Sequence, residues 1–302
     1  SRGVFDRLAR RRGSVAALSQ DRAKLFLVVT PDFVPGALVT LSSFLKHHPG
    51  EGREVYLLQR NLGPAERRCF SKLPFRYHYL EHDPQIVERA AKLPIPIERR
   101  DRLLVLQAFQ LADPDPVLVM DADLLIQGSL KDLLELPGPL VGVGEEVRQA
   151  GGWRHGTTLE EGYGSPPSSA LTDTINTGLF RLDSQLRGQD VYESLLQRLE
   201  PTWWNSLKTD LTDQAVINFH FHRQINLAPP EFNYVLQERQ LYEQVSGLTP
   251  DQCPVLHFSG AYKPWMSHRV VAGDESLLAA ARRWVREWLE VLERLSEVQK
   301  TR

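Results

Sequence analysis

Two carboxylates, Asp121 and Asp123, follow directly on an apolar run that spans residues 117–120. Side chains of an extended chain alternate between two faces, so residues two apart point to the same side. Two such carboxylates suit a hard divalent cation, which takes oxygen ligands and can bridge them to a diphosphate. Aspartate is also common where strands end and turns begin, so the pair alone supports a structural role equally well.

A second group of reactive side chains lies in the segment 255–265, Val-Leu-His-Phe-Ser-Gly-Ala-Tyr-Lys-Pro-Trp. Its apolar, strand-like start leads into His257, Gly260 and Lys263. An imidazole can complete a metal site that already holds two carboxylates, a glycine lets backbone amides approach phosphate, and a lysine supplies a point charge for it. Each residue also has a purely structural explanation, because a single histidine is often a hydrogen-bonded core residue and a single lysine a solvated one.

Together with two further segments, these residues resemble glycosyltransferase family 8, which includes glycogenin and bacterial lipopolysaccharide galactosyltransferases. The matching segments follow the family's order and are 118–123 (Leu-Val-Met-Asp-Ala-Asp), 176–178 (Asn-Thr-Gly), 213–214 (Asp-Gln) and 257–265. The last segment is the most specific of the four, whereas many nucleotide-sugar enzymes share the Asp-x-Asp pair. The resemblance implies an α/β protein of the Rossmann-like GT-A fold, with a mainly parallel central sheet flanked by helices. It also implies a retaining hexosyltransferase that moves a sugar from a UDP-sugar to a hydroxyl acceptor.

The resemblance implies roles for individual residues. Asp121, Asp123 and His257 are expected to bind the metal ion. Manganese is the expected ion, and magnesium is the alternative. The residues expected to contact the donor are Thr30, Asp32, Arg102, Asp121, Ala122, Asp123, Gly260 and Lys263. Asp213, Gln214 and Asn176 are expected to form the catalytic set that positions the sugar.

Strands and helices alternate along the chain in a way that agrees with this fold. Apolar runs ended by turn residues predict strands at 25–30, 54–58, 75–80 and 116–123, and helical spacing predicts helices at 36–48, 64–73, 101–111, 191–199 and 213–219. Strands buried on both faces favour a parallel sheet, which binds ligands at the carboxyl ends of its strands. The Gly-, Ser- and Pro-rich stretch 151–169 predicts a long loop of the kind that acts as a lid.

The expected organisation is one domain with an additional segment at each end. Residues 1–22 form a basic N-terminal segment, and residues 23–270 form the glycosyltransferase domain, with a nucleotide-binding half at about 23–127 and an acceptor and sugar half at about 128–270. Residues 271–302 form a C-terminal amphipathic helix, whose apolar face comprises Leu278, Ala281, Trp284, Trp288, Val291 and Leu295. This face either packs on the core or contacts a membrane or a partner.

The composition excludes several classes of protein. The formal net charge is −2, so no overall basic field attracts nucleic acid. The two cysteines, Cys69 and Cys253, are too few for a disulfide framework and match no zinc-ligand spacing, which favours a cytoplasmic setting. No apolar run approaches the roughly 20 residues that span a bilayer, so any membrane contact is expected to be peripheral, through the C-terminal helix.

Two other functions remain open from the sequence. The segment Thr30-Pro-Asp-Phe departs from the acidic or Asn-Asp-x-Tyr loop usual in the family, which would suit a protein that binds nucleotide sugars without catalysis. A nucleotidyltransferase that forms nucleotide sugars would also have an α/β fold and metal-binding carboxylates, although the chain lacks a Gly-rich, lysine-bearing loop near its start. The acceptor remains open among glycans, lipid-linked sugars and other hydroxyl compounds, because loops of variable sequence bind it.

Overall fold

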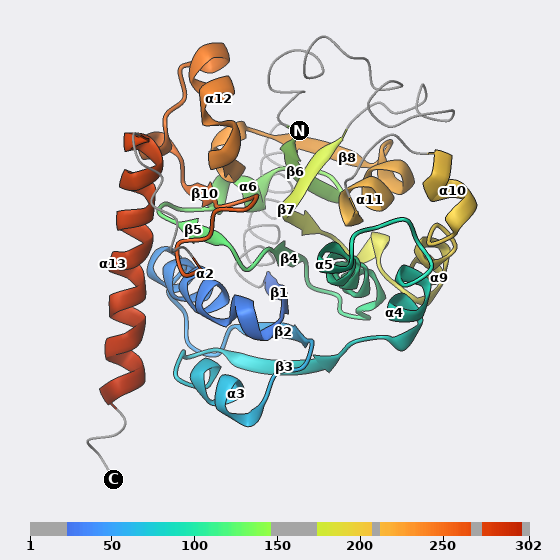
Figure 1. Ribbon diagram of the computed structural model, residues 1–302, viewed down its shortest axis with the longest axis horizontal. Helices are drawn as coiled ribbons and strands as arrows, with labels where there is room; N and C mark the ends of the chain where they lie inside the picture. The colour runs from blue at the N-terminus through green and yellow to red at the C-terminus, as the bar shows by residue number, and fades with distance from the viewer. Residues whose placement is uncertain (1–22, 146–173, 207–211, 267–273, 298–302) are drawn as a thin grey trace, which may run out of the picture.

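The computed structural model describes residues 23–145, 174–206, 212–266 and 274–297 (Figure 1). The basic N-terminal segment and the predicted loop 151–169 lie outside these described residues. The described part of the chain contains a central sheet with helices on both of its faces, as the α/β prediction requires (Figure 1).

Seven strands of the described chain form the central sheet, in the order β3-β2-β1-β4-β7-β6-β8. Their bounds are β1 Lys24–Val29, β2 Glu54–Gln59, β3 Arg76–Glu81, β4 Val117–Met120, β6 Leu140–Gly144, β7 Ile175–Leu182 and β8 Ile225–Ala228. Parallel pairing joins β3, β2, β1 and β4, and also joins β6 to β8. β7 runs antiparallel to both of its neighbours. The sheet is therefore mainly parallel, and the four predicted strands are all present.

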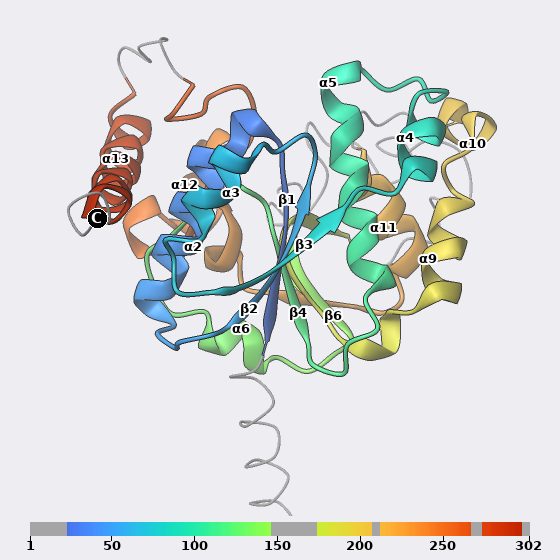
Figure 2. The same cartoon turned by 90° about the horizontal axis from the view of Figure 1, so that it is seen from below.

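Helices cover the two faces of this sheet (Figure 2). One face carries α2 Val34–His47, α3 Pro64–Phe70, α12 Arg239–Ser246 and α13 Glu275–Glu297, and the other carries α4 Pro84–Ala90, α5 Ile97–Arg100, α9 Gln189–Leu196, α10 Pro201–Ser206 and α11 Asp213–Phe221. Apolar side chains from the two faces form two separate core clusters. The predicted helix 101–111 is present as a 3₁₀ helix, η2 Asp101–Gln110, which packs against α9 and α11. The short helix α6 Lys131–Glu135 leads into β6.

A second, smaller sheet brings the C-terminal part of the chain next to the end of β4. Within the described residues its strand order is β5-β10-β9, with bounds β5 Leu124–Ile126, β9 Tyr234–Val235 and β10 Val255–His257. β10 is antiparallel to β5, and their register places His257 opposite Leu124. Because Leu124 directly follows Asp123, this pairing places the histidine beside the predicted metal-binding carboxylates.

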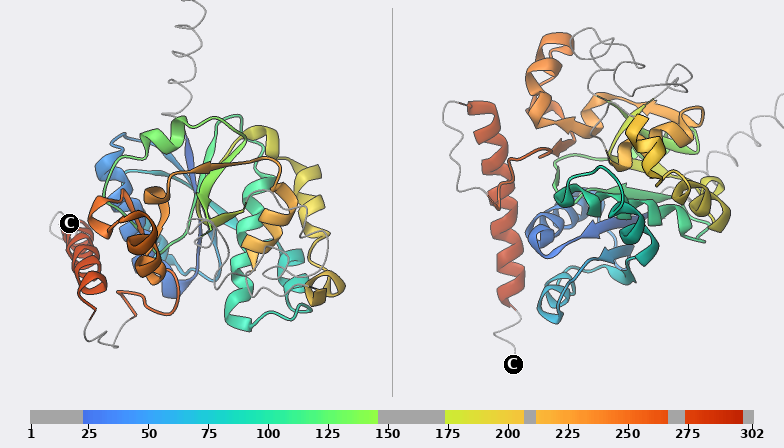
Figure 3. Two further views of the ribbon diagram at one scale, coloured as in Figure 1. Left: turned by 90° about the horizontal axis from the view of Figure 1, so that it is seen from above. Right: turned by 45° about the vertical axis from the view of Figure 1, so that its right-hand side comes forward.

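The C-terminal helix α13 packs against α2, as the core-packing interpretation predicts (Figure 3). Trp284 and Val291 of the predicted face are buried. The prediction is wrong for Leu278, which is partly exposed, whereas its neighbour Leu277 is buried in its place.

A buried carboxylate also lies on the face of α13 that meets α2. Glu287 is buried, and its carboxylate accepts hydrogen bonds from Ser42 Oγ at 2.8 Å and from Lys46 Nζ at 2.5 Å, both on α2. The face that meets α2 therefore includes Glu287, which the apolar pattern alone does not indicate. No helix in the described part of the chain is long and apolar enough to cross a bilayer.

Candidate active site

The backbone just beyond β4 holds the two predicted carboxylates. The N–H of Asp121 donates to the carbonyl oxygen of Gly178 in β7 at 2.8 Å, which fixes the chain as it leaves the sheet. The hydroxyl of Thr40 on α2 donates to the carbonyl oxygen of Leu124 at 2.8 Å and accepts the N–H of Leu124 at 3.2 Å. The turn between β4 and β5 is therefore held from both sides.

Two further segments lie close against the turn that carries the carboxylates. The N–H of Phe258 donates to the carbonyl oxygen of Asp123 at 3.0 Å, which extends the contact between β10 and β5. A Cβ at Gly36 would lie 2.2 Å from the carbonyl oxygen of Ala122 and 2.6 Å from Trp265. Glycine at position 36 therefore lets α2 lie directly against the turn that carries the carboxylates.

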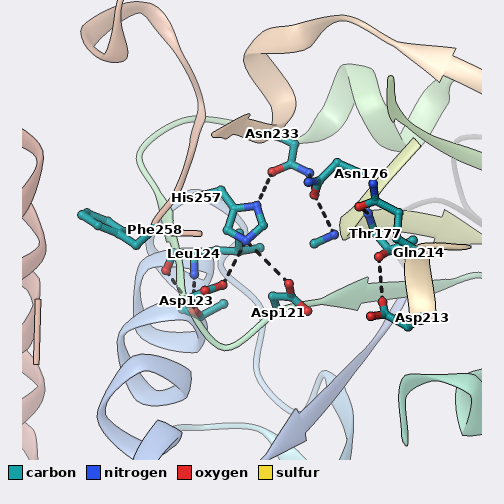
Figure 4. Close-up of polar contacts among 12 residues, drawn as sticks. Asp121, Asp123, Leu124, Asn176, Thr177, Asp213, Gln214, Asn233, His257 and Phe258 are labelled. Carbon is teal, nitrogen blue, oxygen red and sulfur yellow. Dashed lines mark hydrogen bonds and ion pairs between the residues drawn. The ribbon is translucent and has the colours of Figure 1, made fainter. Parts of the chain in front are cut away.

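The side chains of Asp121, Asp123 and His257 converge at this turn (Figure 4). His257 Nε2 lies 3.2 Å from Asp123 Oδ1 and 3.6 Å from Asp121 Oδ2. One ligand atom from each residue can be chosen so that all three lie within 4.8 Å of one another. The Asp123 and His257 side chains are buried, whereas 48% of the Asp121 side chain is exposed, so the group opens to solvent on the Asp121 side.

Lys263 contributes a buried positive charge to the same site. Its Nζ donates to Asp123 Oδ2 at 2.5 Å and to the carbonyl oxygen of Phe258 at 2.6 Å. It also lies 5.7 Å from the centre of the Phe33 ring, near enough for a cation–π contact. Asp123 thus has one oxygen toward Lys263 and the other toward His257.

These charges shift the pKa values of the three residues. Burial alone would raise the pKa of Asp123, but Lys263 and His257 outweigh burial and hold this pKa well below its ordinary value. Loss of surrounding water and the charge of Asp123 raise the pKa of Asp121. Burial lowers the pKa of His257, but Asp123 and Asp121 raise it by more. A cation bound here would displace a proton, so its binding should weaken as the pH falls.

The arrangement fits a divalent cation. Oδ1 of Asp123 is buried, and apart from the ring of His257 at 3.2 Å it has no hydrogen-bond partner, although a buried carboxylate oxygen normally has one. Two carboxylates and one imidazole supply the hard oxygen ligands and the nitrogen ligand that Mn²⁺ accepts. Asp121, Asp123 and His257 could therefore hold the metal ion that the sequence predicts.

The predicted catalytic set lies on β7 and at the start of α11 (Figure 4). The carboxylate of Asp213 accepts the hydroxyl of Thr177 at 2.7 Å and that of Thr212 at 2.9 Å. The amide of Gln214 is held at both ends, because its oxygen accepts the N–H of Thr177 at 3.3 Å and its nitrogen donates to Glu145 at 2.7 Å. Asp213 is also close enough to influence the pKa of Asp121, so this set borders the metal-binding group.

The remaining predicted donor residues lie around this centre. Arg102 on η2 is exposed, and its charge acts on Asp121. Asp32 is exposed in the 3₁₀ helix η1 Pro31–Phe33, and its carbonyl oxygen accepts Trp265 Nε1 at 2.8 Å. Thr30 is the residue between β1 and η1, and Gly260 has a positive φ of 84°. This left-handed backbone favours glycine, and a Cβ at position 260 would also displace the side-chain end of Gln237, whose Oε1 would lie 1.9 Å from it.

An aromatic stack links the segment after β1 to the C-terminal helix. Phe33 meets Trp265 edge to face at 5.6 Å, Trp265 stacks on Trp284 at 5.4 Å, and Trp284 stacks on Trp288 at 5.9 Å. Side chains of α13 therefore pack against Trp265 of the segment 257–265, and through it they support the segment after β1.

Several residues that contact the predicted site were not identified from the sequence. They include Asn233, which contacts His257 and Asn176, Thr177, which contacts Asp213 and Gln214, and Glu145, which contacts Gln214. Thr177 falls inside the Asn-Thr-Gly segment, so that segment was a signal for it. Asn233 and Glu145 belong to no recognisable motif, and nothing in their neighbouring residues distinguishes them.

Comparisons with known proteins give one family and one fold. The family model described as glycosyl transferase family 8 matches residues 24–269. The galactosyltransferase LgtC, solved with donor and acceptor sugar analogues, is similar with a TM-score of 0.69 and 18% identity, over 88% of this chain and 95% of its own. GlyE of Streptococcus pneumoniae gives a TM-score of 0.58 and 15% identity, over 90% of this chain and 63% of its own. Mouse xyloside xylosyltransferase 1 gives a TM-score of 0.51 and 17% identity, over 78% of this chain and 97% of its own. A search of curated proteins gives no match.

The family match and the structural likeness agree with the geometry of the site. The matched residues include β4 with the two carboxylates that follow it, the predicted catalytic set on β7 and α11, and β10 with His257. The structural neighbours named above are glycosyltransferases, and each likeness extends over most of this chain. The chain therefore belongs to glycosyltransferase family 8 and is a glycosyltransferase of the GT-A fold.

Proposed function

We propose that this protein is a retaining hexosyltransferase that transfers a sugar from a UDP-hexose to a hydroxyl acceptor, with Mn²⁺ as its ion and Mg²⁺ as the second choice. The observation that carries the proposal is the convergence of Asp121, Asp123, His257 and Lys263 at the carboxyl end of β4. Open α/β sheets bind ligands at this end of their strands. A site with acidic metal ligands and a buried ammonium suits a diphosphate better than a neutral ligand.

Asp121, Asp123 and His257 would hold the cation, which when bound neutralises the charge that grows on the departing diphosphate. Lys263 adds a second positive charge in a buried position, where solvent screens it poorly. Charges that the protein already holds near the leaving group stabilise the transition state more than the ground state. This difference lowers the barrier and accelerates the transfer.

Asp213, Gln214 and Asn176 would position the donor sugar. The protein holds Asp213 through two hydroxyls and Gln214 at both ends of its amide. Side chains held in this way suit fixed hydrogen bonds to sugar hydroxyls better than attack on the anomeric carbon. We therefore propose that the donor configuration is retained because the diphosphate leaves and the acceptor attacks on the same face of the sugar.

The proposed halves of the domain, about 23–127 and about 128–270, meet at this site. β5 comes from the first half and β10 from the second, and their pairing joins Asp123 to His257. Donor binding therefore uses both halves, and we propose that the acceptor, a glycan, a lipid-linked sugar or another hydroxyl compound, binds mainly against the second.

Isothermal titration of UDP into the protein with Mn²⁺, and again with a chelator, tests the proposed donor site. We expect metal-dependent binding that weakens by at least about 100-fold, or about 2.8 kcal/mol, in Asp121→Ala and His257→Ala. Asp132→Ala, which removes an exposed carboxylate from α6, is the matched control and should bind like the wild type.

The outcomes separate the three functions. Absence of UDP binding in every condition would remove the donor-site proposal. UDP binding without donor hydrolysis or transfer in an acceptor screen would indicate a nucleotide-sugar binding protein. Release of pyrophosphate from UTP and a sugar phosphate would indicate a nucleotidyltransferase.

We also propose that the protein works in the cytoplasm at a membrane surface, which α13 contacts peripherally. Val285, Leu289 and Leu292 lie on one side of α13 and are 43%, 53% and 40% exposed. Arg282 and Arg286 on the same helix are exposed and could meet anionic lipid headgroups.

Sedimentation with vesicles rich in anionic lipid tests the membrane contact. At low salt the wild type should sediment with the vesicles, and the triple variant Val285→Ser/Leu289→Ser/Leu292→Ser should bind at least about tenfold more weakly, because it has less apolar surface to bury. A wild type that ignores anionic vesicles at low salt would refute the contact.

A further inference from the structure

Asn233 lies directly behind the proposed metal ligand His257. It ends the 3₁₀ helix η6 Pro230–Asn233, just before β9, and its side chain is fully buried. Its Oδ1 lies 2.9 Å from His257 Nδ1, and its Nδ2 donates to Asn176 Oδ1 at 2.9 Å (Figure 4). Asn233 therefore connects the imidazole to strand β7.

The far end of this connection determines the direction of every hydrogen bond in it. The backbone N–H of Gly178 donates to the side chain of Asn176 at 2.9 Å. A backbone N–H can only donate, so the atom that Asn176 presents must be its oxygen. The atom that Asn233 presents to this oxygen must then be its NH₂ group, because two amide oxygens cannot bond to each other.

The same reasoning assigns the proton on the imidazole. With its NH₂ directed at Asn176, Asn233 presents its oxygen to His257 Nδ1. An amide oxygen only accepts, so Nδ1 must carry a proton. In the neutral ring the lone pair then lies on Nε2, the atom that faces Asp121 and Asp123.

We propose that Asn233 is a positioning residue that holds His257 with its proton on Nδ1, so that Nε2 is available to the metal ion. The inference rests on the proposed metal site. Metal-binding histidines commonly donate their second N–H to a fixed acceptor, which sets the ring orientation and increases the basicity of the ligand atom. Here the acceptor is a neutral amide whose own orientation depends on a backbone N–H in the central sheet.

Two substitutions separate positioning from simple packing. Asn233→Leu keeps a similar volume and removes the acceptor, and we expect the affinity for Mn²⁺ alone to fall by about 10–100-fold. Saturating Mn²⁺ should restore most of the turnover, because Asn233 would not touch substrate. Asn233→Asp keeps an oxygen toward Nδ1, and its Mn²⁺ affinity should stay close to that of the wild type. It should be less stable, because its second oxygen would face the oxygen of Asn176.

Electron paramagnetic resonance of free Mn²⁺ measures these affinities without any activity assay. A purely structural role would lower the melting temperature of Asn233→Leu and leave its Mn²⁺ affinity unchanged, which would overturn the inference. A wild type that binds no divalent ion would refute the proposed metal site itself, so the two failures are distinguishable.

Nitrogen-15 NMR of the wild type loaded with Zn²⁺, a diamagnetic substitute, tests the inference even if a variant fails to fold. We expect His257 to show a protonated Nδ1 and a metal-bound Nε2. A metal-bound Nδ1, or a proton on Nε2, would overturn the inference.

Discussion

Asp123→Asn is expected to lower kcat/KM for the UDP-sugar donor by about 1,000-fold, or about 4 kcal/mol of transition-state stabilisation. Asparagine keeps the shape of the side chain but removes the negative charge that Lys263 and His257 both face. The cation would lose an anionic ligand, and Lys263 would lose its partner beside the leaving group. Steady-state kinetics at saturating Mn²⁺ measure this effect.

The same substitution should also reduce stability, by about 3 kcal/mol, because it leaves the buried ammonium of Lys263 without its carboxylate. Mn²⁺ should raise the melting temperature of the wild type and have little effect on the variant. Asp183→Asn is the control, since Asp183 lies beyond the opposite end of β7 and pairs with Arg181 at 3.0 Å. An Asp123→Asn enzyme with more than about a tenth of normal turnover would contradict the assigned role.

The strand β4, which leads into the two carboxylates, could be predicted because its residues are buried on both faces of the sheet. The run 117–120 is entirely apolar and ends at two carboxylates, a pattern that identifies both β4 and its functional end. The outer strand β3 was also predicted, although its residues are only partly buried. These are local features, and each can be recognised within one short stretch of sequence.

The position of His257 beside Asp123 could not be predicted from local pattern. It depends on β5 and β10, which are three residues long and too short for a periodic signal. The resemblance to a family supplied the connection. The burial of Glu287 on α13 could not be predicted for a related reason, because its partners Ser42 and Lys46 lie on α2, far away in the sequence.

Asn233 and Gly178 show what a sequence without structure conceals. Asn233 lies between Phe232 and Tyr234 and resembles any polar residue next to a strand. Gly178 resembles a turn glycine after Asn176, but it lies inside β7 with ordinary extended backbone. What requires glycine there is a ring from another strand, which local sequence does not indicate.

Gly178→Ala is therefore expected to displace His257 and to impair metal binding while the fold remains. A Cβ at position 178 would lie 2.2 Å from His257 Cε1 and 2.7 Å from Nδ1, much closer than van der Waals contact. The ring is buried and has little space to move away, so we expect a loss of stability of about 1–3 kcal/mol. Gly142→Ala is the matched control, because its Cβ would meet the flexible end of Ile175 at 2.9 Å, away from the carboxylates.

The functional effect of Gly178→Ala should exceed its effect on stability. A shift of about 1 Å in a positioned group can cost about 100-fold in rate, so kcat/KM should fall by at least that factor. Mn²⁺ affinity should fall as well, because Nε2 would no longer face both carboxylates, whereas Gly142→Ala should lose stability and keep its Mn²⁺ affinity. If Gly178→Ala binds Mn²⁺ as tightly as the wild type, the imidazole does not lie against β7 in the metal-bound protein. The contact between β7 and the ring would then not be what holds His257 at the metal.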